Sequence, residues 1–417
     1  MFPPLVAGGA PRMGQFARLL PDFDWDVTVL TAKHEGVDTL AVDALAGRAR
    51  IIGTRSPSKI VPRGLPTPKH GPAALARAAA RTIVRSILFP DREILWVPGA
   101  IEAGRRVLDE TPHDAVFATH GPGSNLIVGH WLARSRRLPL IVDFRDLWST
   151  TTVSNFASSL HRVAARKLER AIVGDASRLV AVAPAMTDEL VTSNGLDVRR
   201  GVTITNGFDP DDATRVHDAR TRDAPFRLMY TGSVNMHYDF TSLWRALQAM
   251  ADRGVIRPET FRVEFVGNLA LSDVRAFGIE AFFDTKPFVA HSAVFDELAR
   301  ADALLVLETP GYYARYSYAA KVFDYLLTGK PVLALVEQGG NTARLLTAAG
   351  VGYFGHPDKQ HEIESAIERL LPLRGKPPKH ATSTDAPLVD FDRRNLTRTL
   401  AATLDEVVAT EPRGRWD

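Results

Sequence analysis

Two charged residues three positions apart, Lys321 and Asp324, are the first candidates for chemistry in this sequence. A helix that begins near Ser317 would place both side chains on one face. Its first-turn N–H groups would point at an anion beside the Lys321 ammonium, and Asp324 could accept hydrogen bonds from two ribose hydroxyls. The pair therefore suits a diphosphate joined to a ribose. A solvated lysine–aspartate pair on an ordinary amphipathic helix ending at Gly329 has the same spacing and stays an alternative.

A second polar group follows the apolar run 139–142 and contains Arg145 and Asp146. Open α/β sheets place their sites just beyond the carboxyl ends of strands. Arg145 could face the charge that develops on a leaving phosphate, and Asp146 could orient an acceptor or hold Arg145. His120 opens a Gly-Pro-Gly-Ser turn and could contact the acceptor or the phosphate. These three are the candidate catalytic residues, although an ion pair that shapes the loop and a structural histidine would look the same.

The elements that must position these residues are short apolar runs alternating with longer amphipathic ones. This alternation is typical of βαβ units and of parallel sheets covered by helices on both faces. We therefore predict an α/β protein of two doubly wound domains. The predicted strands are 26–31, 49–52, 115–118, 140–143, 179–183 and 202–205 in the first half, and 227–231, 262–266, 281–285, 303–308 and 332–336 in the second.

A break in this periodicity separates the two halves at 206–223, where Asn, Gly, Pro and dense charge interrupt the pattern. A chain of 417 residues that is 45% hydrophobic is also too long for one compact core. The predicted organisation is a first domain over 1–208, a linker over 209–225, a second domain over 226–390 and a terminal helical segment over 391–417 that packs back on the first domain.

The start of the chain is irregular, because the turn-rich segment 1–9 leads into a helix over 12–20 with no strand before it. The first strand of a doubly wound sheet is normally central and feeds a Gly-rich turn into the first helix. We expect that the true start lies about seven or more residues upstream. A sheet that has lost a central strand is the alternative.

Composition narrows the classes of function. The balance of 51 Lys and Arg against 48 Asp and Glu gives a net charge of +3, which argues against nucleic acid as a partner. The absence of Cys excludes disulfides, thiol nucleophiles and thiolate-bound metals, and it suits a reducing compartment. No apolar run reaches the roughly 20 residues of a spanning helix, so a cytoplasmic protein is expected. The acidic clusters 209–212 and 390–392 lie in polar turns and are interpreted as helix caps and solvated charge rather than a metal site.

The sequence resembles glycosyltransferase family 4, the retaining enzymes of the GT-B fold. The run Lys321-Val322-Phe323-Asp324-Tyr325, continued by Gly329-Lys330-Pro331-Val332, is similar to the donor-site helix of that family, which reads Lys-x-x-Glu-Tyr. The likeness extends over nearly the whole chain, through Phe2-Pro3-Pro4-Leu5-x-x-Gly8-Gly9, His120-Gly121-Pro122-Gly123-Ser124, Asp143-Phe144-Arg145-Asp146-Leu147-Trp148, Asn206-Gly207-Phe208-Asp209, Tyr230-Thr231-Gly232-Ser233 and Phe288-Val289-x-His291.

The resemblance implies two facing Rossmann-like domains with the site in the cleft between them. It gives Gly8 and Gly9 a role in letting backbone approach the donor pyrophosphate, with Gly232 and Ser233 as the matching loop of the second domain. Phe288 and Val289 fall where relatives hold the nucleotide base. The implied reaction needs no metal, no cofactor and no covalent intermediate, since the diphosphate leaves as the acceptor hydroxyl attacks the same face of the sugar.

Two departures from the family pattern limit what the resemblance implies. The Arg and Lys usual after the second-domain glycine are replaced by Ser233 and by residues 236–238, so phosphate neutralisation would rest on Lys321 and Arg315. Relatives also carry a pair of glutamates separated by seven residues; here the second is Asp324 and the position of the first is Tyr316. The donor sugar is therefore left open.

Together these features predict a metal-independent hexosyltransferase that moves a sugar from a nucleotide diphosphate, most simply a UDP-sugar, to a glycan or lipid-linked acceptor in polysaccharide assembly. Arginines at 77, 81 and 85 with apolar neighbours over 73–89 could touch anionic lipid at the inner face of the cell membrane, or could be a solvated helix face. A sugar-nucleotide epimerase and a degenerate, non-catalytic nucleotide-binding partner protein are the two alternative functions.

Overall fold

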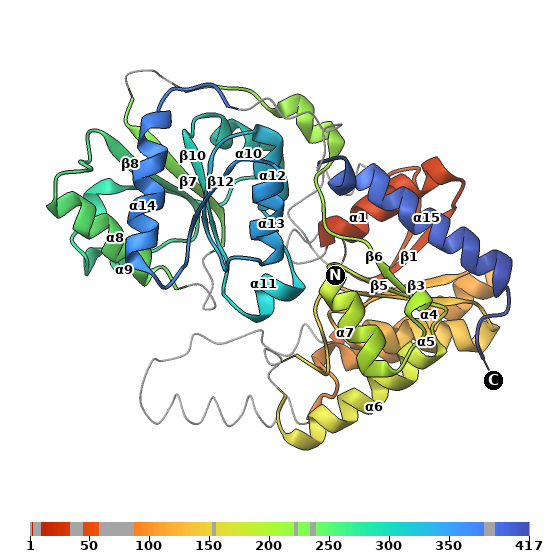
Figure 1. The fold of residues 1–417 in the computed structure, drawn as a ribbon. Helices are drawn as coiled ribbons and strands as arrows, with labels where there is room; N and C mark the ends of the chain where they lie inside the picture. Colours follow the sequence, from red (N-terminus) through yellow and green to blue (C-terminus); the bar gives the residue numbers. More distant parts are fainter. Residues whose placement is uncertain are drawn as a thin grey trace. The chain divides into compact units, whose positions relative to one another are not determined.

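A computed structural model describes residues 2, 10–33, 45–57, 87–151, 156–220, 224–233, 239–378 and 388–416 of the chain (Figure 1). The chain forms two compact units, one of Met1–Thr205 with Thr397–Asp417 and the other of Asn206–Leu396. The segment over 209–225 that sequence analysis treats as a linker falls within the second unit.

The first unit contains two parallel sheets. Strands β1 (Val27–Ala32) and β2 (Ala49–Thr54) pair with each other in parallel. Strands β3 (Val116–Thr119), β4 (Leu140–Phe144), β5 (Arg178–Ala181) and β6 (Gly201–Thr203) form a four-stranded parallel sheet in that order. Every residue of β4 and β5 is buried, as expected of strands covered on both faces.

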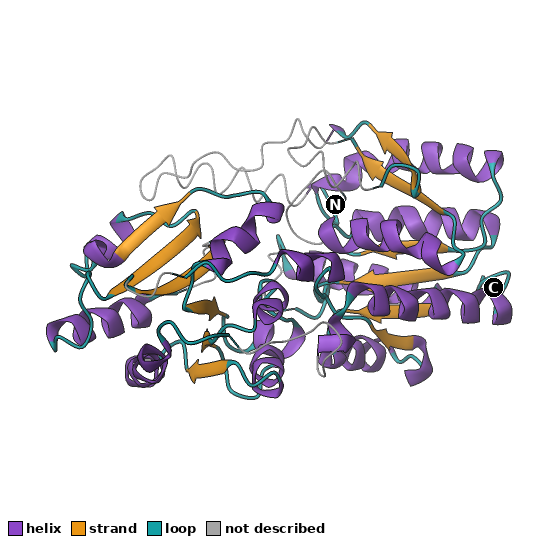
Figure 2. Cartoon of the chain, turned by 90° about the horizontal axis from the view of Figure 1, so that it is seen from above, coloured by secondary structure: helices purple, strands orange, loops and turns teal. Residues whose placement is uncertain are grey.

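Helices cover both sides of these strands (Figure 2). Their ends follow ordinary capping chemistry. The Ser158 hydroxyl accepts a hydrogen bond from the backbone at the start of α6, and Gly195 ends α7 in the left-handed conformation with φ of 67°. The helices are α1 (Ala10–Leu19), α4 (Val97–Glu110), α5 (Ser124–Arg136), α6 (Ser159–Asp175), α7 (Pro184–Asn194) and most of α15 (Arg393–Thr410).

The second unit has one parallel sheet in the order β12-β11-β10-β7-β8-β9. The order reverses between β10 and β7, and open α/β sheets bind ligands at such a switch point, outside the carboxyl ends of the strands. The strands are β7 (Phe226–Gly232), β8 (Phe261–Gly267), β9 (Phe283–Lys286), β10 (Ala303–Leu307), β11 (Val332–Leu335) and β12 (Gly352–Gly355).

Alternate side chains of this sheet build a core on each face. Leu305 of β10 packs with α8 and α14, whereas Leu304 and Val306 pack with α10, α12 and α13. Figure 1 shows these two groups of helices on opposite sides of the strands. The helices are α8 (Thr241–Asp252), α9 (Ser272–Arg275), α10 (His291–Ala299), α11 (Tyr312–Tyr316), α12 (Val322–Thr328), α13 (Asn341–Ala348) and α14 (Gln360–Leu370).

The predicted α/β class with two doubly wound halves is confirmed, and each predicted strand is present with shifted ends. Two predictions were wrong in detail. Strand β12 was missed, because its Gly-Tyr-Phe-Gly sequence lacks an apolar run. The helix carrying Lys321 begins at Val322 rather than near Ser317, so that Lys321 is its N-cap residue.

Candidate functional site

Lys321 lies at the carboxyl end of β7. Its ammonium nitrogen is 3.4 Å from the centroid of the Tyr230 ring, a cation–π contact. The surrounding protein desolvates the ammonium and lowers the pKa of Lys321 from 10.5 to about 7. An anion beside this nitrogen would favour its charged form, because it would offset the cost of desolvation.

Two paired glycines, one of them beside Lys321, end the strands β7 and β8. Gly232 ends β7 with φ of 116°, a conformation that disfavours a side chain, and a Cβ there would lie 3.6 Å from the Lys321 ammonium. Gly267, its partner on β8, has no room for a side chain, because a Cβ would meet the Gly232 carbonyl oxygen at 2.0 Å. The exposed Ser233 follows, with its carbonyl accepting a hydrogen bond of 2.9 Å from the Tyr230 hydroxyl.

Tyr325 joins α12 to the same strand end. Its buried hydroxyl accepts a hydrogen bond of 3.0 Å from the Thr231 backbone N–H. Burial raises the pKa of the Tyr325 hydroxyl, so it stays protonated. This hydrogen bond fixes the position of α12, and with it Lys321 and Asp324, relative to β7. The sequence analysis assigned no role to Tyr325.

Asp324 faces a histidine that the sequence analysis quoted without a role. Its carboxylate lies 3.3 Å from Nε2 of His291, the first residue of α10. Nδ1 of the same ring lies 3.9 Å from Asp212. The hydrogen bond with Asp324 is the largest influence on His291 and raises its pKa, with Asp212 adding to the effect. The imidazole thus lies between two carboxylates, both of which favour its protonated form.

Asp212 corrects one sequence prediction. We expected solvated charge at 209–212, but Asp212 is 5% exposed, and this burial raises its pKa. Asp209 does act as a cap, since its carboxylate accepts from the Asp211 N–H. Asp212, His291 and Asp324 form the one cluster of potential metal ligands among the described residues, with their ligand atoms within 4.8 Å of one another. The imidazole of His291 lies between the two carboxylates of this cluster.

The other predicted donor residues lie near this strand edge or on α11. Phe288 is 57% exposed, and its ring lies 3.6 Å from the place of a Cβ on Gly267, whereas Val289 packs against the core. Arg315 lies in the last turn of α11, with its guanidinium 5.1 Å from the centroid of the Tyr316 ring.

A buried carboxyl, Glu308, was missed by the sequence analysis. It follows β10, is 3% exposed, and desolvation raises its pKa to about 7. It accepts a hydrogen bond of 3.0 Å from Thr342 Oγ1, which in turn accepts from the Ala319 N–H. Asn341 donates to the Arg315 carbonyl at 2.8 Å. The start of α13 thus fixes the segment that precedes Lys321.

In the first unit, His120 is held between two aromatic rings. Its imidazole stacks on Phe144 and Trp148, with ring centroids 5.3 Å away in each case. Desolvation, aided by the positive charge of Arg145, lowers the pKa of His120 to about 3. His120 is therefore a neutral imidazole at physiological pH, 8% exposed.

Arg145 binds the turn that follows His120. Its Nε donates to the His120 carbonyl at 3.0 Å and its terminal nitrogen donates to the Gly121 carbonyl at 2.5 Å. Desolvation lowers the pKa of Arg145, while Asp143 and Asp146 oppose that shift. Asp146 has a large exposed fraction, but the protein around its carboxyl group partly desolvates it, and this raises its pKa against the effect of Arg145. The three predicted catalytic residues thus lie together beyond β3 and β4.

Two supports of this group were not anticipated. Arg12 of α1 forms a buried ion pair of 2.9 Å with Asp143, which also accepts from the Thr119 hydroxyl at 2.7 Å. Asp91 accepts hydrogen bonds from the backbone and the hydroxyl of Ser124, the first residue of α5. Both carboxylates fix the ends of strands and helices around the His120 turn, and both contacts join residues that are far apart in the sequence.

Comparison with known proteins decides the family. Residues 7–207 match the family model described as a glycosyl transferase 4-like domain. The chain is a glycosyltransferase of the family 4 type. The predicted resemblance to that family is confirmed.

Solved structures resemble the glycosyltransferase over nearly its whole length, which confirms the GT-B fold. They include a glycosyltransferase from Rickettsia africae (TM-score 0.65, 11% identity, 97% of each chain covered). Sucrose-phosphate synthase from Thermosynechococcus elongatus gives a TM-score of 0.63 at 13% identity, over 97% of this chain and 94% of that one. The Anabaena protein HepE in complex with UDP gives 0.60 at 15% identity, over 96% and 97%. No curated protein matches the sequence.

Several predicted features of the glycosyltransferase lie outside the described residues. These are Gly8 and Gly9, the replacements at 236–238 and the arginines of the basic stripe over 73–89. Within the described part of the chain, no helix combines the length and the apolar character needed to cross a bilayer.

Proposed function

We propose that the glycosyltransferase takes its sugar from a nucleoside diphosphate, most simply uridine diphosphate, and seats the diphosphate at Lys321. The observation that carries the proposal is the desolvated Lys321 ammonium beside Gly232 at the carboxyl end of β7. A lysine in such a place is a functional candidate because its charge is costly until an anion arrives. Gly232 leaves the backbone bare beside the ammonium, so that a phosphate can approach it, and Gly267 makes room for the Gly232 carbonyl.

Neighbouring residues would bind the ribose and the base of the nucleotide. Asp324 would accept the ribose hydroxyls, with His291 holding its carboxylate from the other side. The exposed Phe288 and the backbone at Val289 would hold the base, and Arg315 would add a second positive charge. A relative of the same fold, HepE, was solved in complex with UDP, which agrees with a uridine nucleotide.

The group around His120 would serve the reaction itself. The bond from the anomeric carbon to the diphosphate breaks as the acceptor oxygen bonds the same face of the sugar, and the acceptor proton passes to the departing phosphate oxygen. Arg145 would stabilise the charge on that phosphate, Asp146 would orient the acceptor, and the neutral His120 could donate or accept one hydrogen bond. This retaining, metal-independent route follows from the family resemblance.

The acceptor we propose is a glycan or a lipid-linked saccharide in polysaccharide assembly. A cytoplasmic enzyme that touches the inner face of the membrane through 73–89 would meet such a lipid-linked acceptor. The sugar itself depends on Tyr316, which stands where relatives carry an acidic residue and which packs against Tyr312 with ring centroids 5.3 Å apart.

Calorimetric titration of UDP tests the donor seat. We expect binding to the 417-residue protein, a loss of at least tenfold in affinity for Lys321→Met, and a smaller loss for Asp324→Asn. Lys359→Met is the matched control, because Lys359 pairs with Glu362 at the exposed start of α14 and should leave affinity unchanged. Equal affinities for the Lys321 and Lys359 variants would refute the donor seat.

Incubation of sugar nucleotides separates the possible reactions. A transferase gives at most slow hydrolysis when the donor is alone and turns over when an acceptor is added, whereas an epimerase converts the donor unaided. Binding of UDP without any turnover across a donor and acceptor panel would favour a non-catalytic binding protein.

A further inference from the structure

The outward side of α6 combines exposed apolar side chains with basic ones. Leu160 is 78% exposed, more than any other large apolar side chain that the structure describes, and Val163 is 54% exposed. Ala164, Lys167 and Arg170 are exposed too, and their spacing of three and four residues continues the same side of the helix. We call these five residues the α6 face. Figure 1 shows α6 at the edge of the first unit, beside α7.

Local carboxylates do not balance the positive charge of the α6 face. The sequence has no Asp or Glu between Asp146 and Glu169. Glu169 points inward, because it is 0% exposed and accepts a hydrogen bond of 2.9 Å from the Ser149 N–H. Asp175, which ends α6, lies 2.8 Å from His130. The two carboxylates of α6 are therefore engaged away from the α6 face, which stays basic.

Other outer helices of the first unit present a different surface. They carry exposed carboxylates, which are Glu102 and Asp109 on α4, Asp188 on α7, and Asp405 and Glu406 on α15. An outward side that joins apolar and basic residues without acidic ones is typical of helices that lie in the interface of an anionic bilayer. The α6 face has this composition.

Further apolar and basic side chains lie beside the start of α6. The Phe89 ring contacts the His161 ring, with centroids 5.9 Å apart, and Ile87, two residues before Phe89, is 73% exposed. The exposed Arg162 places its guanidinium 5.9 Å from the centroid of the Phe156 ring. The apolar and basic surface therefore extends from the α6 face onto a neighbouring segment of the chain.

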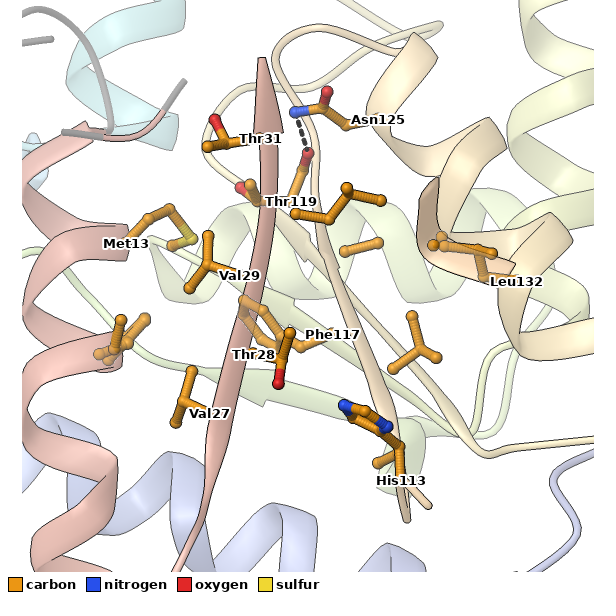
Figure 3. Close-up of a pocket in the computed structure, with 18 of the residues that line it drawn as sticks. Met13, Val27, Thr28, Val29, Thr31, His113, Phe117, Thr119, Asn125 and Leu132 are labelled. Carbon is orange, nitrogen blue, oxygen red and sulfur yellow. Dashed lines mark hydrogen bonds between the residues drawn. The ribbon is translucent and has the colours of Figure 1, made fainter. Parts of the chain in front are cut away.

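The α6 face is separate from the large cavity of this unit. That cavity has a volume of about 1300 Å³ and is lined by residues of β1, β3 and other elements, none of which belongs to α6. Figure 3 shows Val29 of β1, Phe117 of β3 and Leu132 of α5 at the cavity. The apolar residues of the α6 face therefore belong to the surface of the unit and not to the wall of its interior.

Buried contacts join α6 to the loop over 145–148. Glu169 lies on the opposite side of the helix from Leu160, and its carboxylate holds the Ser149 N–H at the end of that loop. Trp148, the residue before Ser149, stacks on His120 with ring centroids 5.3 Å apart. Whatever holds α6 therefore also holds the loop that carries the candidate catalytic residues of this unit.

We propose that the α6 face docks the enzyme on an anionic lipid bilayer. The 17-residue helix, about 25 Å long, would lie along the surface, with Leu160 and Val163 among the headgroups and Lys167 and Arg170 against lipid phosphates. These residues are distinct from the basic stripe over 73–89. The proposal rests on the proposed function only for what the docked loop would meet, a lipid-linked acceptor, and the docking itself requires neither UDP nor turnover.

Flotation of the 417-residue protein with vesicles tests the docking. Binding to vesicles of phosphatidylglycerol and phosphatidylcholine in equal parts should be at least about tenfold tighter than to phosphatidylcholine alone, and should weaken with added salt. Val163→Ser combined with Lys167→Gln should weaken it at least about fivefold. The matched control combines Val198→Ser with Arg199→Gln, because both side chains are exposed elsewhere in the same unit, and it should bind as the unchanged protein does.

Three outcomes of this experiment would overturn the proposal. Equal binding by the two double variants would exclude the α6 face. Loss of binding only on replacing the arginines at 77, 81 and 85 with Gln would place the contact in the 73–89 segment. Self-association without vesicles that Val163→Ser with Lys167→Gln removes would mean that a second copy of the chain covers the α6 face.

A fluorescent label tests which residues enter the lipid. The sequence has no Cys, so a single substitution gives a unique labelling site. Val163→Cys with an environment-sensitive dye should shift its emission to the blue on binding phosphatidylglycerol vesicles, whereas Val198→Cys with the same dye should not. Vesicle binding without a blue shift at Val163→Cys would refute docking through the α6 face, whatever the outcome of the UDP titration.

Discussion

At the scale of single residues, we expect the proposed contact with Lys321 to make the binding of UDP depend on pH. The pKa of Lys321 is lowered to about 7, and a bound diphosphate would raise it again. Below pH 7 the ammonium is already charged, so affinity for UDP should be flat. Above pH 7 a proton must be taken up on binding, so affinity should fall by up to about tenfold per pH unit.

Calorimetry at pH 7, 8 and 9, in buffers of different ionisation enthalpy, measures both the affinity and the proton uptake. Lys321→Met should bind weakly at every pH and without proton uptake. An affinity for UDP that stays constant from pH 7 to 9 would contradict the assignment of Lys321 to the diphosphate.

At the scale of elements, the placement of α12 depends on Tyr325. Tyr325→Phe removes the acceptor of the buried Thr231 N–H, which should cost about 1–3 kcal/mol of unfolding free energy. Because α12 carries Lys321 and Asp324, affinity for UDP should also fall several-fold although no charge is changed. Urea denaturation and calorimetry measure the two effects.

Tyr353→Phe in β12 is the control for this change, since Tyr353 lies in the same unit and is only partly buried. If both variants lose the same stability and neither loses affinity, the link from Tyr325 to the donor seat is wrong.

The elements also show what sequence could predict and what it could not. Continuous apolar runs revealed the buried strands, because burial on both faces demands them, and the Lys-x-x-Asp-Tyr pattern indicated α12, which stays the predicted donor helix. The sequence did not predict the start of α12 correctly, because contacts from Asn341 and Thr342 hold the segment before this helix in another conformation. The sequence also could not predict which residues contact Asp143, Asp324 and Ser124. Their partners Arg12, His291 and Asp91 are far away in the sequence.

At the scale of the whole molecule, each unit has its own sheets and its own core, so we expect two unfolding transitions. UDP should raise the transition of Asn206–Leu396, by about 2.7 kcal/mol at a hundred times its dissociation constant. Phe265→Ala removes a fully buried ring of that unit and should lower the same transition by about 3–5 kcal/mol. Ile141→Ala, at a fully buried site of β4, should lower the other transition and leave the shift with UDP intact. Calorimetric scans of the three proteins with and without UDP measure this, and a single transition displaced equally by both variants would mean that the units unfold as one.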